Sequence, residues 1–175
     1  MEELILRRPT EGDYDEIAAY RAEFLAAGSS MDGAGPLRRF EDPEQWLREV
    51  RRYEDPAALP EDLVLATQFV FVRMPENRIV GMLNVRHYFN DYLALCGGNI
   101  GYSVRPSERR KGYAKKMLHD SLGYCREIGL DRVLITCLVD NEPSRRTILS
   151  QGGVYENTVQ DTRDDCQLER YWIQL

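Results

Sequence analysis

The hydrophobic positions change period several times along the chain, and each change marks an expected element. Continuous or alternating apolar runs of four to ten residues predict strands, and apolar residues repeated every three or four positions predict helices. Glycine, proline, asparagine and aspartate gather between these runs, where turns are expected. The expected order is a strand, two helices, three antiparallel strands, a helix, a strand, a helix and two strands, without internal repeat or linker.

The first half of the chain is expected to hold two helices and a hairpin. Thr10 and Asp13 can cap a helix that reaches about Ala26. A short strand at residues 4–7 precedes it. After it we expect a mobile loop marked by Gly28, Gly33, Gly35 and Pro36, a helix from Pro43 to Tyr53 with Trp46, Leu47 and Val50 facing the core, and a hairpin of residues 63–72 and 78–88 around Pro75-Glu76-Asn77.

In the second half, a loop at residues 90–98 leads to the third antiparallel strand, at 99–105. The helix that starts at Lys111 ends at Gly129, and a buried parallel strand follows at residues 133–139. Asp140 to Ser144 then begin a short helix that stops at Gly152-Gly153, before strands near 154–159 and 167–174. The apolar face of the helix from Lys111 holds Ala114, Met117, Leu118, Ser121, Leu122, Cys125 and Ile128.

The turn Arg109-Arg110-Lys111-Gly112-Tyr113-Ala114 carries the clearest functional signal. The first N–H groups of a helix have no internal partner and lie at the positive end of its dipole, so they can point at an anion. Gly112 lets the backbone come close. A basic turn on an ordinary surface helix is the simpler interpretation, but three cations oppose the helix dipole unless something negative is bound. The turn therefore predicts a polyanionic ligand.

The residues of this turn and of the second short helix resemble those of the GNAT superfamily of acyl-CoA-dependent N-acetyltransferases. Its phosphate turn, Arg/Gln-x-x-Gly-x-Gly/Ala, is matched by Arg109, Gly112 and Ala114. Its next unit, Asn-x-x-Ala/Ser followed by a helix and Gly-Phe or a similar pair, is matched by Asn141, Ser144 and Gly152-Gly153. The resemblance covers about residue 63 to the C-terminus, and the sequence from Gly97 to Ala114 is similar to that of an uncharacterised bacterial branch. P-loop and dinucleotide-binding motifs are absent.

The resemblance implies an α/β fold in which a central mixed sheet, flanked by helices, has two parallel strands that splay apart around pantetheine. Backbone groups of Ser103 and Val104 would pair with the pantetheine amides, and the N–H of Tyr102 would polarise the thioester carbonyl. The pyrophosphate of acetyl-CoA would bind Arg109 and the turn from Arg110 to Ala114. Asn141 and Ser144 would flank the far side of the cofactor. The cofactor-binding residues expected from the resemblance are thus Tyr102, Ser103, Val104, Arg109, Arg110, Lys111, Gly112, Tyr113, Ala114, Asn141 and Ser144.

The catalytic acid and base of better-known relatives are missing. Thr136 stands where ribosomal-protein acetyltransferases carry a glutamate, and Ile148 stands where a tyrosine usually protonates the leaving thiolate. Gly98 and Asn99 stand where histone-type enzymes carry their base. His87, expected opposite Ile100, is the candidate base, and a structural histidine at a strand end is the alternative. Tyr155 and Tyr113 are weaker candidates for the acid. Cys137 is expected in the core rather than as a nucleophile, and His119 is expected to be solvated on its helix.

Composition fits a single domain of residues 1–175 that needs no metal or disulfide, since 43% of the residues are hydrophobic. A net charge of −6 argues against nucleic acid or a membrane as partner. Cys96, Cys125, Cys137 and Cys166 are too far apart for the usual zinc pairings and suggest a reducing compartment. The acidic start Met1-Glu2-Glu3 does not resemble a signal peptide, so we expect a cytoplasmic protein, and a homodimer is compatible with the sequence.

We therefore expect an acetyl-CoA-dependent N-acetyltransferase that works by direct transfer, with the amine acceptor entering near residues 28–36 and the second helix. Two alternatives stay open at this point. One is a sensor of the same fold that binds acyl-CoA without turnover, and the other is a polyanion-binding module that uses the basic turn alone. The sequence does not identify the acceptor.

Overall fold

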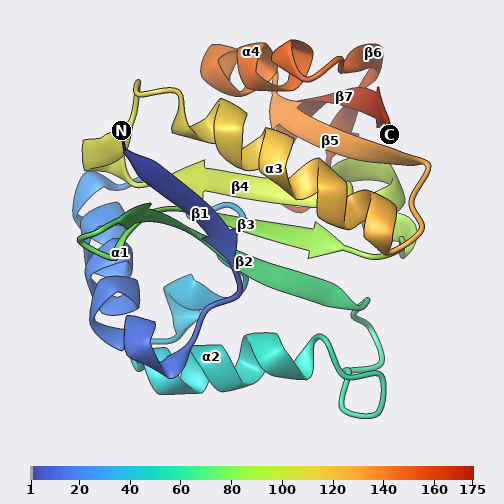
Figure 1. Cartoon of the computed structure of the whole chain (residues 1–175). Helices are drawn as coiled ribbons and strands as arrows, with labels where there is room; N and C mark the ends of the chain where they lie inside the picture. Colours follow the sequence, from blue (N-terminus) through green and yellow to red (C-terminus); the bar gives the residue numbers. More distant parts are fainter. Residues whose placement is uncertain (1) are drawn as a thin grey trace.

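The strands form two antiparallel sheets that lie side by side in the computed structural model, which describes residues 2–175 and leaves Met1 outside (Figure 1). The first sheet has the order β1-β2-β3-β4 and the second the order β5-β7-β6. The strands are β1 (Glu3–Arg7), β2 (Ala66–Met74), β3 (Arg78–Arg86), β4 (Ile100–Val104), β5 (Arg132–Leu138), β6 (Val154–Asp161) and β7 (Cys166–Gln174).

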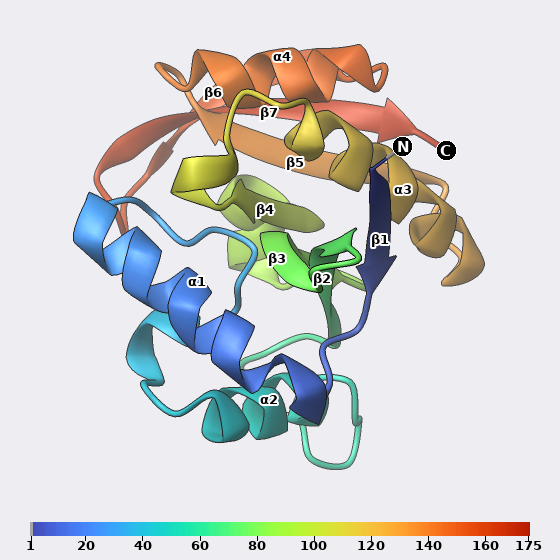
Figure 2. The same cartoon turned by 60° about the vertical axis from the view of Figure 1, so that its left-hand side comes forward.

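Helices cover both faces of the first sheet. Figure 2 shows α1 and α2 on one side of strands β1–β3, with α3, β5 and α4 on the other. The four α-helices are α1 (Tyr14–Ala27), α2 (Pro43–Arg52), α3 (Tyr113–Glu127) and α4 (Glu142–Ser150). Of the described residues, none belongs to a helix long and apolar enough to cross a membrane.

Strand β2 shows why the apolar runs of the hairpin are continuous rather than alternating. Phe69 and Phe71 pack into the core beneath α3, while Val70 and Val72 pack into a second core beneath α1 and α2. Successive side chains of a strand point to opposite faces, so a strand covered on both faces must be apolar at every position. The hairpin strands are therefore the central layer of the molecule.

The two sheets meet at Asn99, immediately before β4. The Asn99 N–H donates to the Leu134 carbonyl of β5 over 2.8 Å, and the Asn99 side-chain oxygen accepts from the Leu134 N–H over 2.8 Å. The side-chain nitrogen donates to the Arg86 carbonyl of β3 over 3.2 Å. Gly98, with φ +67°, is required beside it because a Cβ there would lie 2.5 Å from the Leu134 oxygen. Beyond this junction β4 and β5 form no ladder with each other.

The expected fold is confirmed, with one correction to its strand pairing. Strand β5 was expected to be a parallel strand of one mixed sheet. It does run in the same direction as β4 (Figure 1), but its only ladder within residues 2–175 is antiparallel, with β7. Asn99 replaces the ladder that a parallel pair would form, so the two strands separate from this point.

Two loops are more ordered in structure than expected. The loop at residues 90–98 contains a π-helical turn, Leu93–Gly97. The glycine-rich segment after α1, expected to be mobile, packs into the core through Met31, Ala34 and Leu37. Gly33 approaches β4 so closely that a Cβ would lie 2.4 Å from the Gly101 oxygen.

Candidate active site

The turn between β4 and α3 presents a series of unpaired backbone N–H groups. Arg110 and Gly112 both have left-handed backbone conformations, with φ of +65° and +81°. No described residue accepts a hydrogen bond from the amides of residues 110–115, and no side chain caps α3. Consecutive N–H groups in such a conformation form a concave anion-binding site at the positive end of a helix. Gly112 caps the helix, which starts two residues later than the sequence predicts.

The basic side chains of this turn are more engaged than the sequence suggests. Arg109 turns back to donate to the Val104 carbonyl over 3.1 Å and to the Ser29 hydroxyl over 2.8 Å. Lys111 donates to the carboxylate of Glu108 over 2.7 Å. Arg110 is exposed and pairs with no carboxylate of the described residues. The repulsion expected from three free cations is thus partly relieved by the protein itself.

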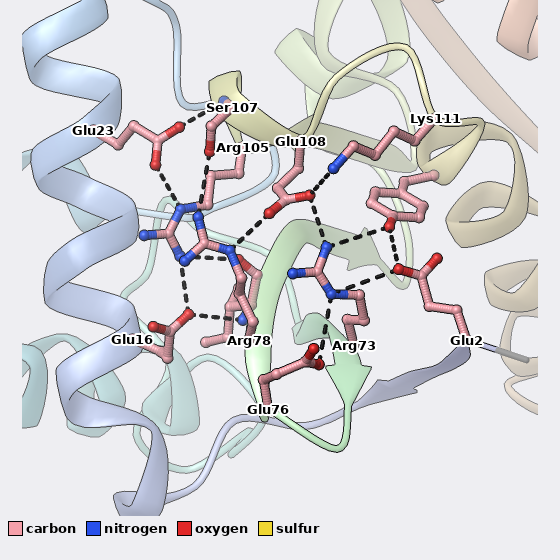
Figure 3. Close-up of polar contacts among 12 residues, drawn as sticks. Glu2, Glu16, Glu23, Arg73, Glu76, Arg78, Arg105, Ser107, Glu108 and Lys111 are labelled. Carbon is pink, nitrogen blue, oxygen red and sulfur yellow. Dashed lines mark hydrogen bonds and ion pairs between the residues drawn. The ribbon is translucent and has the colours of Figure 1, made fainter.

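Glu108 holds the turn to the hairpin (Figure 3). Its buried carboxylate accepts from Lys111, from Arg78 over 2.7 Å and from Arg73 over 2.9 Å. Burial alone would raise the pKa of Glu108, but the hydrogen bonds from Lys111 and Arg78 and the charge of Arg73 hold it at about 2. In the sequence, Lys111 is near Glu108, but Arg73 and Arg78 lie 35 and 30 residues away from it. Only the pair of Glu108 and Lys111 could therefore have been found from local spacing.

A second ion-pair group holds the same turn to α1 (Figure 3). Arg105 is buried and pairs with Glu23 over 2.6 Å and with Glu16 over 2.9 Å. Glu23 also accepts from the Ser107 N–H over 2.6 Å. The N–H groups that follow are therefore anchored to two other elements, which favours binding because the turn is ordered before a ligand arrives.

The register of β4 decides which of its backbone groups are free. The Arg86 N–H donates to the Asn99 carbonyl, and the Arg105 N–H donates to the Val80 carbonyl. Because hydrogen-bonded pairs alternate along an antiparallel ladder, the bonded residues of β4 between these two are Gly101 and Ser103. The N–H and carbonyl groups of Tyr102 and Val104 consequently point away from β3, toward the gap between the sheets. Those of Ser103 point at β3. The role expected for the Ser103 backbone is therefore wrong, because those groups belong to the ladder.

Tyr102 and α4 lie on opposite sides of this gap and are joined by a hydrogen bond. The Tyr102 hydroxyl lies 2.8 Å from the Ser144 hydroxyl, and burial raises the pKa of the tyrosine. Asn141 caps α4, since its side chain accepts from the Ser144 N–H over 3.2 Å. The structure thus brings Tyr102 and the start of α4 together, although they are about forty residues apart in sequence.

His87 lies in a different place from the one expected. Val85, not His87, is opposite Ile100, so His87 follows two residues beyond it. Its Nε2 lies 2.8 Å from the Thr67 hydroxyl and 3.4 Å from the Tyr124 hydroxyl. Along the strands it stands about four residues from Tyr102, roughly 13 Å at about 3.3 Å per residue. This separation and its hydroxyl partners favour the structural alternative.

The positions of the missing acid and base hold structural residues. The Thr136 hydroxyl donates to the Cys96 carbonyl over 2.6 Å, and Ile148 is fully buried in the core. The weaker candidates are also in structural surroundings. Tyr113 and Cys137 are buried, and the exposed Tyr155 of β6 bonds Thr158. His119, an exposed residue of α3, contacts Gln151. Burial raises the pKa of Cys137 to about 11, so its thiol is not an activated nucleophile.

A cavity that the sequence does not reveal lies on the α1 and α2 side of β3. It has a volume of about 630 Å³ and is lined by residues from six separate segments, among them Gly35, Tyr53, Arg86, Tyr92 and Arg163. Because each segment contributes only one to four residues, no local pattern could have indicated it. The lining includes the loop and helix end where the acceptor was expected.

Comparison with known proteins identifies the family. A family model described as an acetyltransferase (GNAT) domain matches residues 3–154. The chain belongs to the GNAT acetyltransferase family. This GNAT protein is accordingly an acyltransferase, and the two motifs predicted it correctly. No curated protein sequence matches it significantly.

Solved structures of the same family share the fold of this GNAT chain. Ribosomal-protein-S5-alanine acetyltransferase from Vibrio fischeri is 17% identical with a TM-score of 0.74, covering 99% of this chain and 94% of that one. Mycobacterium smegmatis RimJ in complex with CoA-disulfide is 20% identical with a TM-score of 0.70, covering 98% and 81%. A spermidine N-acetyltransferase SpeG chimera from Vibrio cholerae and hSSAT is 17% identical with a TM-score of 0.66, covering 98% and 95%. At these identities the likeness concerns the fold.

Proposed function

We propose that this GNAT protein binds acetyl-CoA and transfers the acetyl group to a primary amine of a small molecule or peptide by direct attack. The observation that carries the proposal is the anchored turn with six consecutive amides, 110–115, that no described residue pairs. A polyanion is the ligand that such a turn fits best. Because members of the GNAT family use acetyl-CoA, we propose acetyl-CoA as this polyanion.

In this proposal the amides of residues 110–114 and the Arg110 guanidinium hold the pyrophosphate. Tyr102 and Val104 supply the backbone groups that face the gap between the sheets, and Asn141 and Ser144 lie across it. Acetyl-CoA supplies the activated acetyl thioester. The Tyr102 N–H, which lies outside the β3 ladder, donates to the carbonyl oxygen on which negative charge develops during attack.

The amine must be neutral to attack, and an alkyl amine with a pKa of about 10 is mostly protonated at neutral pH. Thr136 has no carboxylate to accept the amine proton, and Ile148 has no group to protonate the leaving thiolate. This favours one alternative, a member of the fold that binds acyl-CoA without turnover. We further propose that residues 1–175 form a single domain in a cytoplasmic, bacterial setting. The four free cysteines support the reducing compartment.

Calorimetry with a pair of glycine variants tests cofactor binding. Gly112 and Gly129 stand at opposite ends of α3, both have positive φ, and a Cβ at either would meet open space. Gly112→Val and Gly129→Val should therefore carry similar backbone strain. Only Gly112→Val is expected to weaken acetyl-CoA binding, by about tenfold or more, because its branched carbons would lie where the phosphate approaches.

The same titration separates the alternatives. The wild-type protein should bind acetyl-CoA more tightly than acetyl-pantetheine, and unchanged affinity in Gly112→Val would sink the phosphate assignment. Equal affinity for unrelated nucleotides and polyphosphates would favour a polyanion-binding module. Tight binding of acetyl-CoA with no thiol release across a broad amine panel would favour the sensor.

A further inference from the structure

The cavity beside β3 is unusually rich in arginine for a protein of net charge −6. Arg38, Arg39, Arg86 and Arg163 all line it, and Asp62 is the one acidic residue of its lining. The four arginines come from the segment after α1, from the end of β3 and from the turn between β6 and β7. Their convergence makes the cavity a region of positive potential.

None of the four guanidinium groups has a carboxylate partner among residues 2–175. Arg38 donates to the Ser29 carbonyl over 2.7 Å, Arg86 donates to the Gly97 carbonyl over 3.3 Å, and Arg163 lies over the ring of Tyr92 at 3.7 Å. By contrast, Arg73, Arg78 and Arg105 at the phosphate turn are all paired with glutamates. The charges of the cavity are thus left for something other than the protein's own carboxylates.

Arg86 links the cavity to the transfer site. It is half-buried, and this burial lowers the pKa of its guanidinium, which the more distant charge of Asp32 partly offsets. A Cβ built on Gly101 would lie 3.3 Å from both of its terminal nitrogens. Gly101 directly precedes Tyr102 on β4. A desolvated positive charge therefore stands one residue from the backbone group assigned to the thioester.

We propose that this cavity binds the acceptor and that the acceptor is a small amine that also carries a carboxylate or phosphoryl group. The inference rests on the proposed function and adds the charge class of its substrate. Guanidinium groups bind both oxyanions in a bidentate manner, and a volume of about 630 Å³ suits a small molecule. A polyamine would bring further positive charge to four unpaired arginines, which is unfavourable.

Matched acceptor pairs test the proposal, with thiol release from acetyl-CoA as the measurement. The pairs are each common L-amino acid against its α-amide, O-phosphoethanolamine against ethanolamine, and spermidine as the cationic reference. At least one carboxylate or phosphate member should exceed its neutral partner by about tenfold or more in kcat/KM. The pair that responds distinguishes a carboxylate from a phosphoryl substrate.

Arg86→Gln should remove that preference, with a loss of about tenfold or more for the anionic member and less than about twofold for its neutral partner. Arg126→Gln, an exposed α3 arginine outside the cavity, is the control and should change neither. The affinity for acetyl-CoA should stay the same in both variants. Because Arg86 packs beside Gly101, Arg163→Gln on the exposed turn serves as a second variant should Arg86→Gln fail to fold.

The outcomes separate this proposal from the function on which it rests. Failure of acetyl-CoA to bind would overturn the proposed function. Turnover that is equal within every pair, or fastest with spermidine, or restricted to peptides without an acidic residue, would overturn the anionic acceptor and leave the acetyltransferase intact. If nothing is turned over, calorimetry with the anionic probes decides, since no Arg86-dependent binding would also overturn the proposal.

Discussion

At the scale of single residues, burial sets the charge state of His87. Its imidazole is half-buried between β2 and α3, and this burial lowers its pKa below the ordinary value. Two hydroxyl groups, of Thr67 and Tyr124, are within hydrogen-bond distance of Nε2. A hydroxyl can donate to or accept from a neutral imidazole, so these partners stabilise the neutral form. His87 therefore behaves as part of the packing between strand and helix.

We predict that His87→Gln destabilises the protein most at neutral pH and progressively less as the pH falls. The unfolded chain binds a proton at His87 below about pH 6.5, whereas the folded chain does so only at lower pH. The stability that neutral His87 contributes is therefore lost on acidification in the wild type, and the variant has none to lose. Urea midpoints at pH 7.5 and pH 5 measure the difference.

His119→Gln, at the exposed histidine of α3, is the control for this experiment. It should differ from the wild type by no more than about 0.5 kcal/mol at either pH. A gap between wild type and His87→Gln that stays constant or widens at pH 5 would contradict the account. A rising limb in the activity profile that disappears in folded His87→Gln would instead restore this residue as the base.

At the scale of elements, the separation of β4 and β5 depends on Asn99. This residue is buried, and its side chain uses both ends, one toward β3 and one toward β5. The separated strands leave the Tyr102 and Val104 backbone groups outside any ladder and facing the gap, where the Val104 carbonyl accepts from Arg109. The feature that makes room for a ligand is thus a single side chain that takes the place of a strand ladder.

Asn99→Ala is predicted to lower the free energy of unfolding by about 2 to 6 kcal/mol. The substitution leaves the buried Leu134 N–H and Arg86 carbonyl without partners, each costing about 1 to 3 kcal/mol. Urea denaturation measures the change. Gln167→Ala, on the exposed side of β7, should cost less than about 0.5 kcal/mol. A loss below about 1 kcal/mol for Asn99→Ala would show that solvent or relaxation satisfies these groups.

The sequence predicted the order and type of the elements because apolar period, caps and turns are local signals. It also located the turn before α3, because Arg109, Gly112 and Ala114 are close in sequence, and phosphate binding there stays a prediction. It misplaced His87 by two residues, because the register of β4 depends on how many residues the π-helical turn at 93–97 takes up. The partners of Glu108 and the arginines of the cavity could not be predicted, since they come from distant segments.

At the scale of the whole molecule, two positive regions flank β4 in a protein that is negative overall. One is the anchored turn that precedes α3, and the other is the cavity beside Arg86 on the side of α1 and α2. Strand β4 lies between them, with the backbone groups of Tyr102 and Val104 outside the β3 ladder. In the proposed function, the anionic cofactor binds at the turn and the anionic acceptor binds in the cavity.

A crystal structure of the complex with CoA tests the central claim most directly. The account predicts pyrophosphate oxygens within hydrogen-bond distance of the amides of residues 110–114 and the CoA sulfur close to the Tyr102 N–H. It also predicts Asn141 and Ser144 beside the cofactor on the other side of the gap. CoA bound away from this turn, or with its pantetheine outside the gap between β4 and β5, would contradict the account.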